Sequence, residues 1–255
     1  MLQIRQTQVR VLEDGSWRKF EDEMVQHSLQ FSPTLSNQLG EPQLRIALRQ
    51  CIARAREYGF TNRGPVRLFI ESRFLFGSSF DTDPQYPWAA QILAADDDQM
   101  SRAYDLVRKI IQYQTRVAGP DGINTRKALL ALNAFARQQL EISNDDFVER
   151  MLEQLRQSFP QKAAYIGEDG LVELITGAQD DLQKYHFPIR GLVTVVILMF
   201  AFGHGCTRDP LYPWISATLT DERIVDAAAR AARLEKKALT WLDAVIARFG
   251  EGSSA

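Results

Sequence analysis

Apolar residues recur along this chain at the spacing of helices that bury one side. Phe147, Met151 and Leu155 lie four residues apart, and Phe20 and Met24 repeat the pattern earlier in the chain. Residues at this spacing share one face of a helix, so both segments are predicted to be amphipathic helices. The prolines that follow these segments are expected to end the helices: Pro33 and Pro160.

Further helices are expected in the same order in both halves of the chain. Second helices are predicted over about residues 41–58 and 169–185. The next segments, about 65–76 and 192–202, are rich in Val and Ile, which would suit strands. The apolar residues of the first of these segments nevertheless gather on one side of a helix, and charged residues stand four apart on the other. We therefore predict helices here and an all-α fold.

A long helix is predicted to close each half. Residues 224–249 carry a continuous apolar stripe, with Asp221 or Thr220 as the expected N-cap. The acidic run at 96–98 is expected to cap the matching helix of the first half, because acidic side chains favour the positive end of a helix dipole. Residues 118–122 combine Gly and Pro and form the clearest break between the halves.

Two segments of the chain have nearly the same sequence. Phe76–Trp88 and Phe202–Trp214 share the pattern F-G-x-x-[FC]-x-x-D-P-x-Y-P-W, and matched residues continue on both sides in the same order. So many ordered matches indicate a tandem duplication of one helical unit. We predict unit one over residues 1–125 and unit two over residues 126–255, packed as one pseudo-symmetric bundle in a compact domain.

The two units are not expected to be equivalent in their third helix. The first-unit segment carries Arg67, Glu71 and Arg73, so one of its sides is expected to face solvent. The second-unit segment, 192–202, is apolar nearly all round, which is typical of a buried helix. We therefore predict that the second of these helices is central.

The repeated motif has a structural and a functional interpretation. Gly77 and Gly203 can end a helix in a conformation that other residues avoid. Asp83 and Asp209 precede prolines, and their carboxylates can accept backbone N–H groups and cap the next helix. The favoured interpretation is a rigid corner between two helices with buried aromatic rings, and the alternative is a repeated ligand or partner loop. The remaining motif residues are Pro84, Tyr86, Trp88, Pro210, Tyr212 and Trp214.

An Arg-Gly pair also recurs before the third helix of each unit. Arg63-Gly64 and Arg190-Gly191 place an arginine at a helix start, where the dipole disfavours a positive charge. The arginine must therefore gain an interaction elsewhere. We expect a bidentate pair with the aspartate of the same unit, Asp83 or Asp209, and phosphate binding is the alternative.

Composition excludes several classes of partner. The chain of 255 residues has a formal net charge of -2, so neither nucleic acid nor a membrane surface is expected as its main partner. Its longest apolar run, Leu192–Phe202, is too short to span a bilayer, and its N-terminus lacks the apolar core of a signal peptide. A cytoplasmic protein of unknown oligomeric state is expected.

No residue pattern proposes catalysis. His204, Cys206 and Asp209 could suggest a metal site, but their counterparts in the first unit are Ser78, Phe80 and Asp83, so no metal is expected. None of the three histidines is repeated, and no nucleophile, phosphate-loop or dinucleotide motif is present. We therefore predict a protein that is not an enzyme and that has no cofactor.

Several short stretches of the first unit resemble one protein family. They are Ile4-Arg5-Gln6, Phe20-Glu21-Asp22 with Met24 and His27, Phe76-Gly77, Phe80-Asp81-Thr82-Asp83-Pro84 and Tyr86-Pro87-Trp88. In these the chain resembles small helical proteins of Gram-negative bacteria whose genes often lie beside type VI secretion effector genes. The resemblance implies a cytosolic accessory to an antibacterial toxin, above all its immunity protein. In the second unit, Gly205-Cys206-Thr207-Arg208 departs from the pattern.

Three functions therefore remain open. An immunity protein would bind the cognate effector encoded nearby and occlude its active site, and an acidic surface would suit a nuclease toxin. An adaptor or chaperone would instead load the effector for secretion, and the third function is an enzyme with a cleft between the units. The candidate partner-binding residues are Asp96, Asp97, Asp98, Asp145, Asp146, Asp180 and Asp181.

Overall fold

Every regular element in the described part of the chain is helical, which confirms the all-α prediction. The computed structural model describes residues 6–138 and 141–251, so Ile4 and Arg5 of the family resemblance lie outside the described residues. The helices are α1 Gln6–Phe31, α2 Pro33–Glu57, α3 Arg63–Phe76, α4 Pro87–Leu93, α5 Gln99–Tyr113, α6 Ile123–Ala136, α7 Phe147–Ser158, α8 Pro160–Ile166, α9 Glu168–Leu182, α10 Ile189–Phe202, α11 Pro213–Leu219 and α12 Ala227–Glu251. None of the helices in these ranges has the length and apolarity to cross a membrane.

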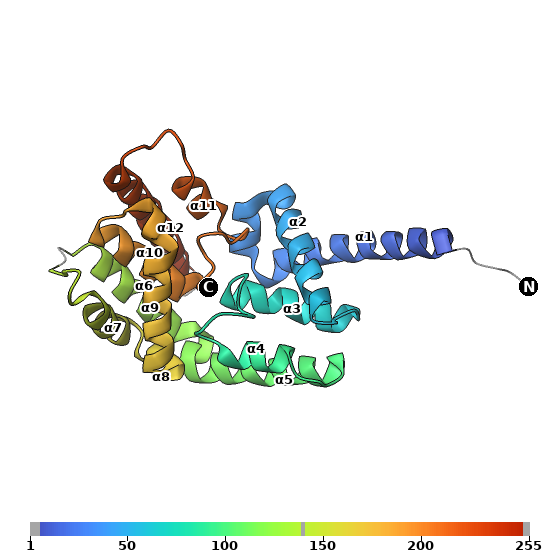
Figure 1. Cartoon of the computed structure of the whole chain (residues 1–255). Helices are drawn as coiled ribbons and strands as arrows, with labels where there is room; N and C mark the ends of the chain where they lie inside the picture. Colours follow the sequence, from blue (N-terminus) through green and yellow to red (C-terminus); the bar gives the residue numbers. More distant parts are fainter. Residues whose placement is uncertain (1–5, 139–140, 252–255) are drawn as a thin grey trace, which may run out of the picture.

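The helices fall into two neighbouring groups. Figure 1 shows α1 to α5 on one side and α6 to α12 on the other, with α1 reaching outward towards the N-terminus. Buried apolar residues form two clusters that follow this division: one lies within residues 20–110, and the other, apart from Ala47, within residues 117–234. Four partly buried side chains pack against both clusters: Leu39, Phe74, Tyr113 and Tyr165.

The predicted ends of the first helices are confirmed. Helix α1 ends at Phe31 and α7 ends at Ser158, and Pro33 and Pro160 then begin the next helices. Proline suits the first helical position because its missing N–H would have no partner there. A glycine with positive φ interrupts the helical path soon afterwards in both halves, at Gly40 inside α2 and between α8 and α9.

Helices α3 and α10 are both 14 residues long, and both end at the glycine of the repeated motif. The backbone angles there are nearly equal: φ 95° and ψ 160° at Gly77, φ 97° and ψ 153° at Gly203. This conformation has a positive φ but an extended ψ, so it belongs to a region open almost only to glycine. The prediction that these segments are helices is confirmed.

Helix α10 is buried on nearly every side, as predicted, with ten of its residues buried. Helix α3 differs from the prediction at one position. Arg67 is exposed, but Arg73 is buried. Burial raises the pKa of the nearby Cys51 thiol to about 11, and the positive charge of Arg73 acts against this rise. The expectation that Arg73 belongs to a solvated face was therefore wrong.

The last helix begins later than its apolar stripe suggested. Helix α12 starts at Ala227, and Val225 lies before it with 91% of its surface exposed. The carboxylate of Asp226 accepts the N–H of Ala229, which stabilises the first turn, whereas Asp221 binds the Arg223 side chain. The expected N-cap at Asp221 or Thr220 was wrong, because Asp226 supplies the acceptor closer to the helix.

The helical path breaks within the predicted residues 118–122. Gly119, Asp121 and Gly122 have positive φ, and helix α6 begins directly after them. The buried residues of α6 all belong to the second apolar cluster: Ala128, Leu132 and Phe135.

Candidate functional site

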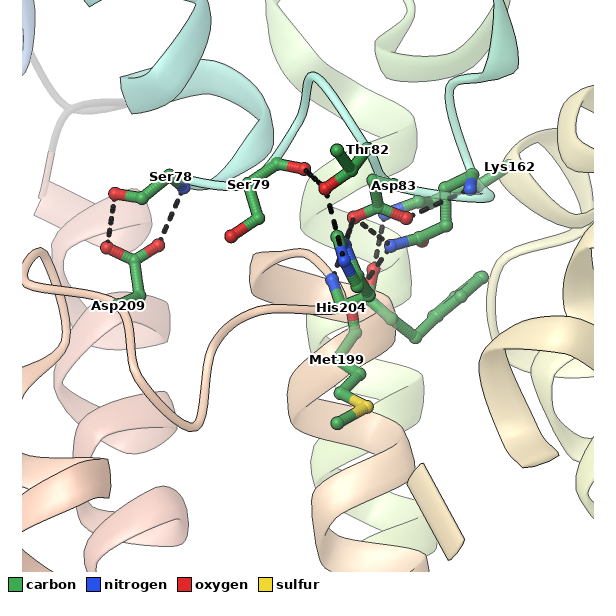
Figure 2. A network of polar contacts seen from close by, with 10 residues as sticks. Ser78, Ser79, Thr82, Asp83, Lys162, Met199, His204 and Asp209 are labelled. Atoms are coloured by element: carbon green, nitrogen blue, oxygen red, sulfur yellow. Dashed lines mark hydrogen bonds and ion pairs between the residues drawn. The ribbon is translucent and has the colours of Figure 1, made fainter. Parts of the chain in front are cut away.

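The two repeated loops lie against each other and exchange hydrogen bonds. Ser78 donates its backbone N–H to Oδ2 of Asp209 at 2.7 Å and its hydroxyl to Oδ1 of the same residue at 2.5 Å. In the other direction, the backbone N–H of His204 donates to Oδ2 of Asp83 at 2.7 Å. Figure 2 shows the two contacts at opposite ends of the paired loops, with Lys162 beside Asp83. Each loop thus supplies an acceptor for the other.

Each aspartate also holds its own loop in shape. Oδ1 of Asp83 accepts the N–H of Gln85 at 2.9 Å, and Oδ1 of Asp209 accepts the N–H of Leu211 at 2.8 Å. Bonding to the N–H two residues ahead is a common turn-forming use of aspartate. Neither carboxylate caps the helix that follows: Tyr86 and Tyr212 occupy the N-cap positions of α4 and α11, and neither helix start has a side-chain cap hydrogen bond.

The backbones of the two loops approach too closely for any side chain at the motif glycines. A Cβ on Gly77 would lie 2.0 Å from the carbonyl oxygen of Phe202, and one on Gly203 would lie 2.6 Å from that of Phe76. A Cβ on Gly205 would lie 2.2 Å from Oγ of Ser79. All three glycines are therefore needed for contact between the loops, and Gly77 and Gly203 also for their positive φ.

The aromatic rings of the motif differ in burial, and the glycines of the two Arg-Gly pairs differ in the space around them. Tyr86, Trp88 and Tyr212 are buried, whereas Trp214 is partly exposed. A Cβ on Gly191 would lie 2.8 Å from the Cβ of Ala231, so this glycine allows α10 and α12 to approach closely, while Gly64 has open space around it. Most of the motif is therefore internal scaffold, as the rigid-corner interpretation predicts.

Burial and neighbouring groups shift the pKa values of two residues in the second loop, Asp209 and His204. Burial raises the pKa of Asp209, although hydrogen bonds from Ser78 and Leu211 favour its anion. Burial also opposes the charged form of His204, but Asp83, whose Oδ2 lies 3.3 Å from Nδ1, and the more distant Asp181 and Asp81 outweigh it, so the pKa of His204 is raised. The loop pair is thus sensitive to pH at its His204 end.

The cysteine of the second loop is protonated and buried. Cys206 is fully buried, and burial raises the pKa of its thiol well above the ordinary value. A protonated, buried thiol is a poor metal ligand and nucleophile. No group of three His, Cys, Asp or Glu side chains within the described ranges is placed to hold a metal ion.

The repeated arginines do not pair with the motif aspartates, so that expectation was wrong. Arg63 binds Glu23 of α1 and lies over the ring of Phe20. Arg190 binds Glu235 of α12 with two nitrogens and also donates to two backbone carbonyls, those of Ala136 and Gln138. Both arginines do gain a carboxylate, but on another helix.

The candidate acidic residues lie in three separate regions. Figure 1 places the connection between α4 and α5 at the opposite side of the molecule from the start of α7, and the end of α9 lies apart from both. The structure therefore does not gather them into one acidic patch.

Three of the seven acidic residues stabilise local structure. Asp98 is the N-cap of α5, as predicted, and accepts N–H groups of Met100 and Ser101. Asp146 binds Ser143 and Arg150, and Asp181 binds Thr207 and Arg208. The remaining four are exposed: Asp96, Asp97, Asp145 and Asp180.

An apolar stripe on α5 was missed by the sequence reasoning. Met100 and Ile111 are each 56% exposed, Tyr104 is 67% exposed and Val107 is 36% exposed. Their spacing of four, three and four residues puts them on one helix face, next to the face that carries the buried Ala103, Leu106 and Ile110. The spacing was visible in the sequence, but the helix has apolar residues on two faces, and only the fold shows which face is covered.

Comparison of this chain with protein-family models, with curated proteins and with solved structures finds no match.

Proposed function

We propose that this chain is an immunity protein that binds and neutralises a cognate type VI secretion toxin, and that the exposed face of α5 is its docking surface. The observation that carries the proposal is the row Met100, Tyr104, Val107 and Ile111 on the outside of α5. Isolated exposed apolar residues are ordinary, but a contiguous row along one helix is typical of a protein interface.

The charges at the N-terminal end of this row favour a basic partner. Asp96 and Asp97 are exposed directly before α5, and Asp98 caps its first turn. An interface commonly has an apolar centre and a polar rim, and acidic rim residues attract a partner with lysines and arginines around its own apolar patch. A nuclease has such a basic surface, because it must bind phosphates. The proposed occupant is therefore an apolar patch beside the basic cleft of the toxin.

The repeated motif leaves this face free. Its aspartates and glycines hold the two loops together inside the molecule, and none of them lies on α5. Such a division of labour suits a binding protein, in which an internal scaffold supports a separate outer surface. The adaptor function would use the same surface, since an adaptor must also bind the effector.

The test is protection of cells that express the toxin. The product of the neighbouring effector gene is expressed with the wild-type chain, with the Tyr104→Asp/Ile111→Asp variant, or with Val225→Asp. The last is a matched control, because Val225 is also exposed and apolar but lies far from α5 in sequence. We expect wild type and control to restore growth and the α5 variant to fail while keeping its Tm.

The outcomes separate the alternatives. A complex without protection, combined with loss of toxin delivery when the gene is deleted, would instead identify an adaptor. Protection by the α5 variant equal to wild type would reject α5 as the docking surface. Failure of the wild-type chain to bind any neighbouring effector would reject both functions.

We also propose that the two halves arose by tandem duplication. Support comes from the ordered sequence matches and from equal elements, namely α3 and α10 with the short helices α4 and α11 that follow them. In an experimental structure, residues 20–88 are expected to superimpose on residues 147–214 with these helices paired. Different crossing angles for the paired helices would contradict the proposal.

A further inference from the structure

A cavity lies between the two halves of the chain, behind the paired loops. Its volume is about 340 Å³, and its wall combines the helix-ending Phe76 and Phe202 with the motif residues Tyr86 and Tyr212. Three exposed residues stand at its rim, which opens it to solvent: Leu75, Gln114 and Ala201. The cavity has the size of the smaller known ligand pockets, which begin at roughly 300 Å³.

One charged side chain lines this aromatic cavity. Lys162 of α8 is only 3% exposed, and its ammonium donates to the carbonyl oxygen of Phe200. It also lies over aromatic rings, 4.8 Å from the ring centre of Phe200 and 5.7 Å from that of Tyr86. Within the described residues no carboxylate oxygen lies within 4 Å of it, although the charge of Asp83 acts on it from farther away.

This environment is unusual for a lysine. A buried ammonium group is normally paired, because its desolvation costs several kcal/mol. Burial lowers the pKa of Lys162 to about 8, so the group is still mostly protonated at neutral pH. An ammonium has three N–H donors, and one backbone carbonyl satisfies only one of them. An anion in the cavity would supply the missing acceptor.

We propose that this cavity binds a small planar carboxylate, an aromatic acid of one or two rings, with its carboxylate on Lys162 and its rings among the aromatic side chains. A single lysine suits a singly charged group, whereas phosphate sites combine several donors, and no arginine lines this cavity. Aromatic walls favour a flat apolar body through edge-to-face and stacked contacts.

The ligand would contact both halves of the chain. Phe76 and Tyr86 come from the first half, and Phe202 and Tyr212 from the second. Within the second half, the rings of Phe202 and Tyr212 stack on each other at a centre-to-centre distance of 4.2 Å. Because a ligand that binds only the folded state stabilises it, occupancy of the cavity should raise the Tm.

The experiment uses the full chain and two probes of equal shape, indole-3-acetate and its neutral amide, with benzoate as a one-ring acid. Binding is measured by calorimetry and by the shift in Tm. We expect both acids to bind and the amide to bind at least tenfold more weakly. The affinity for indole-3-acetate should fall as the pH rises past 8, where the lysine loses its proton.

Two variants and one control variant make the result specific. Lys162→Met keeps an unbranched side chain but removes the charge, and should abolish the preference for acid over amide. Lys127→Met, at an exposed lysine, is the control and should bind as wild type does. Ala201→Phe changes only the exposed rim and should weaken both acid and amide.

The same measurements can overturn the proposal. It is wrong if neither acid binds the folded wild-type chain, or if acid and amide bind equally. Unchanged binding in the Ala201→Phe variant would also place the ligand elsewhere, even if Lys162→Met did not fold. None of these outcomes depends on the effector, so they leave the proposed immunity function to its own test.

Discussion

Asp83 accepts the backbone N–H of His204 at 2.7 Å, across 121 residues of sequence. The counterpart contact, between Ser78 and Asp209, has the same length and runs in the opposite direction. Hydrogen bonds to a charged group contribute about 1.5–3 kcal/mol each when buried. The repeated aspartates therefore act as acceptors between the loops, and this explains why both loops carry one.

Replacing either aspartate by asparagine should destabilise the fold. In Asp83→Asn or Asp209→Asn, an NH₂ group would face a backbone N–H, so at least one buried donor would lose its partner. Each change should lower the free energy of unfolding by about 1–3 kcal/mol. Chemical denaturation provides the measurement, and Asp96→Asn, an exposed control, should stay within about 0.5 kcal/mol of wild type. Equal midpoints for all three variants would show that the loop contact contributes little.

The motif glycines should not tolerate a methyl group. Gly77→Ala would place a Cβ 2.0 Å from the carbonyl oxygen of Phe202 at a φ of +95°, so backbone strain and overpacking add. The expected loss is about 2–5 kcal/mol. Gly64→Ala, inside the helix that Gly77 follows, is the matched control, because nothing lies within 4 Å of its added Cβ. Thermal unfolding should show a large fall in Tm for the first variant and none for the second; a Gly77→Ala chain as stable as wild type contradicts the close approach.

Stability should fall between pH 6 and pH 8 because of His204. Its pKa is raised in the folded chain by Asp83, so its contribution is complete below its unfolded value of about 6.5. That contribution is lost as the pH rises through the higher folded value. Urea midpoints at pH 6 and pH 8 measure the change, and His204→Gln should reduce the slope. A slope that this substitution leaves intact must come from other groups.

The two repeated arginines should contribute unequally. Arg190 binds Glu235 and two backbone carbonyls, one at the last residue of α6 and one two residues later, whereas Arg63 makes one exposed ion pair with Glu23. Exposed pairs contribute about 0–1 kcal/mol, and a multiply bonded arginine contributes more. We expect Arg190→Ala to cost about 1–2 kcal/mol and Arg63→Ala less than about 1 kcal/mol. The reverse order in denaturant melts would contradict this assignment.

The fold was predictable from the sequence where local rules decide it. The spacing of apolar residues identified α7, and a proline marked the end of α1. Residues 192–202 are apolar on nearly every side of the helix, which identified a buried helix. The capping aspartate Asp98 was also found, because its partners lie two and three residues ahead. Each of these features depends on neighbours within one helix.

Features that depend on distant partners were missed. Arg63 was paired with Asp83 because both recur, but Ser78, His204 and the own-loop N–H groups already occupy the aspartates. The start of α12 was placed too early, since an apolar stripe continues into a loop at Val225. Nothing in the local sequence marks Lys162, whose environment comes from Phe200 and Tyr86 far along the chain.

We propose that partner recognition lies on the outer face of α5, whereas the paired loops hold the fold. Calorimetric titration of the neighbouring effector into the Tyr104→Asp/Ile111→Asp variant tests it most directly, with Tm measured on the same samples. The account predicts a wild-type Tm together with binding weakened at least a hundredfold. Binding as tight as that of the wild-type chain, in a variant with an unchanged Tm, would contradict it.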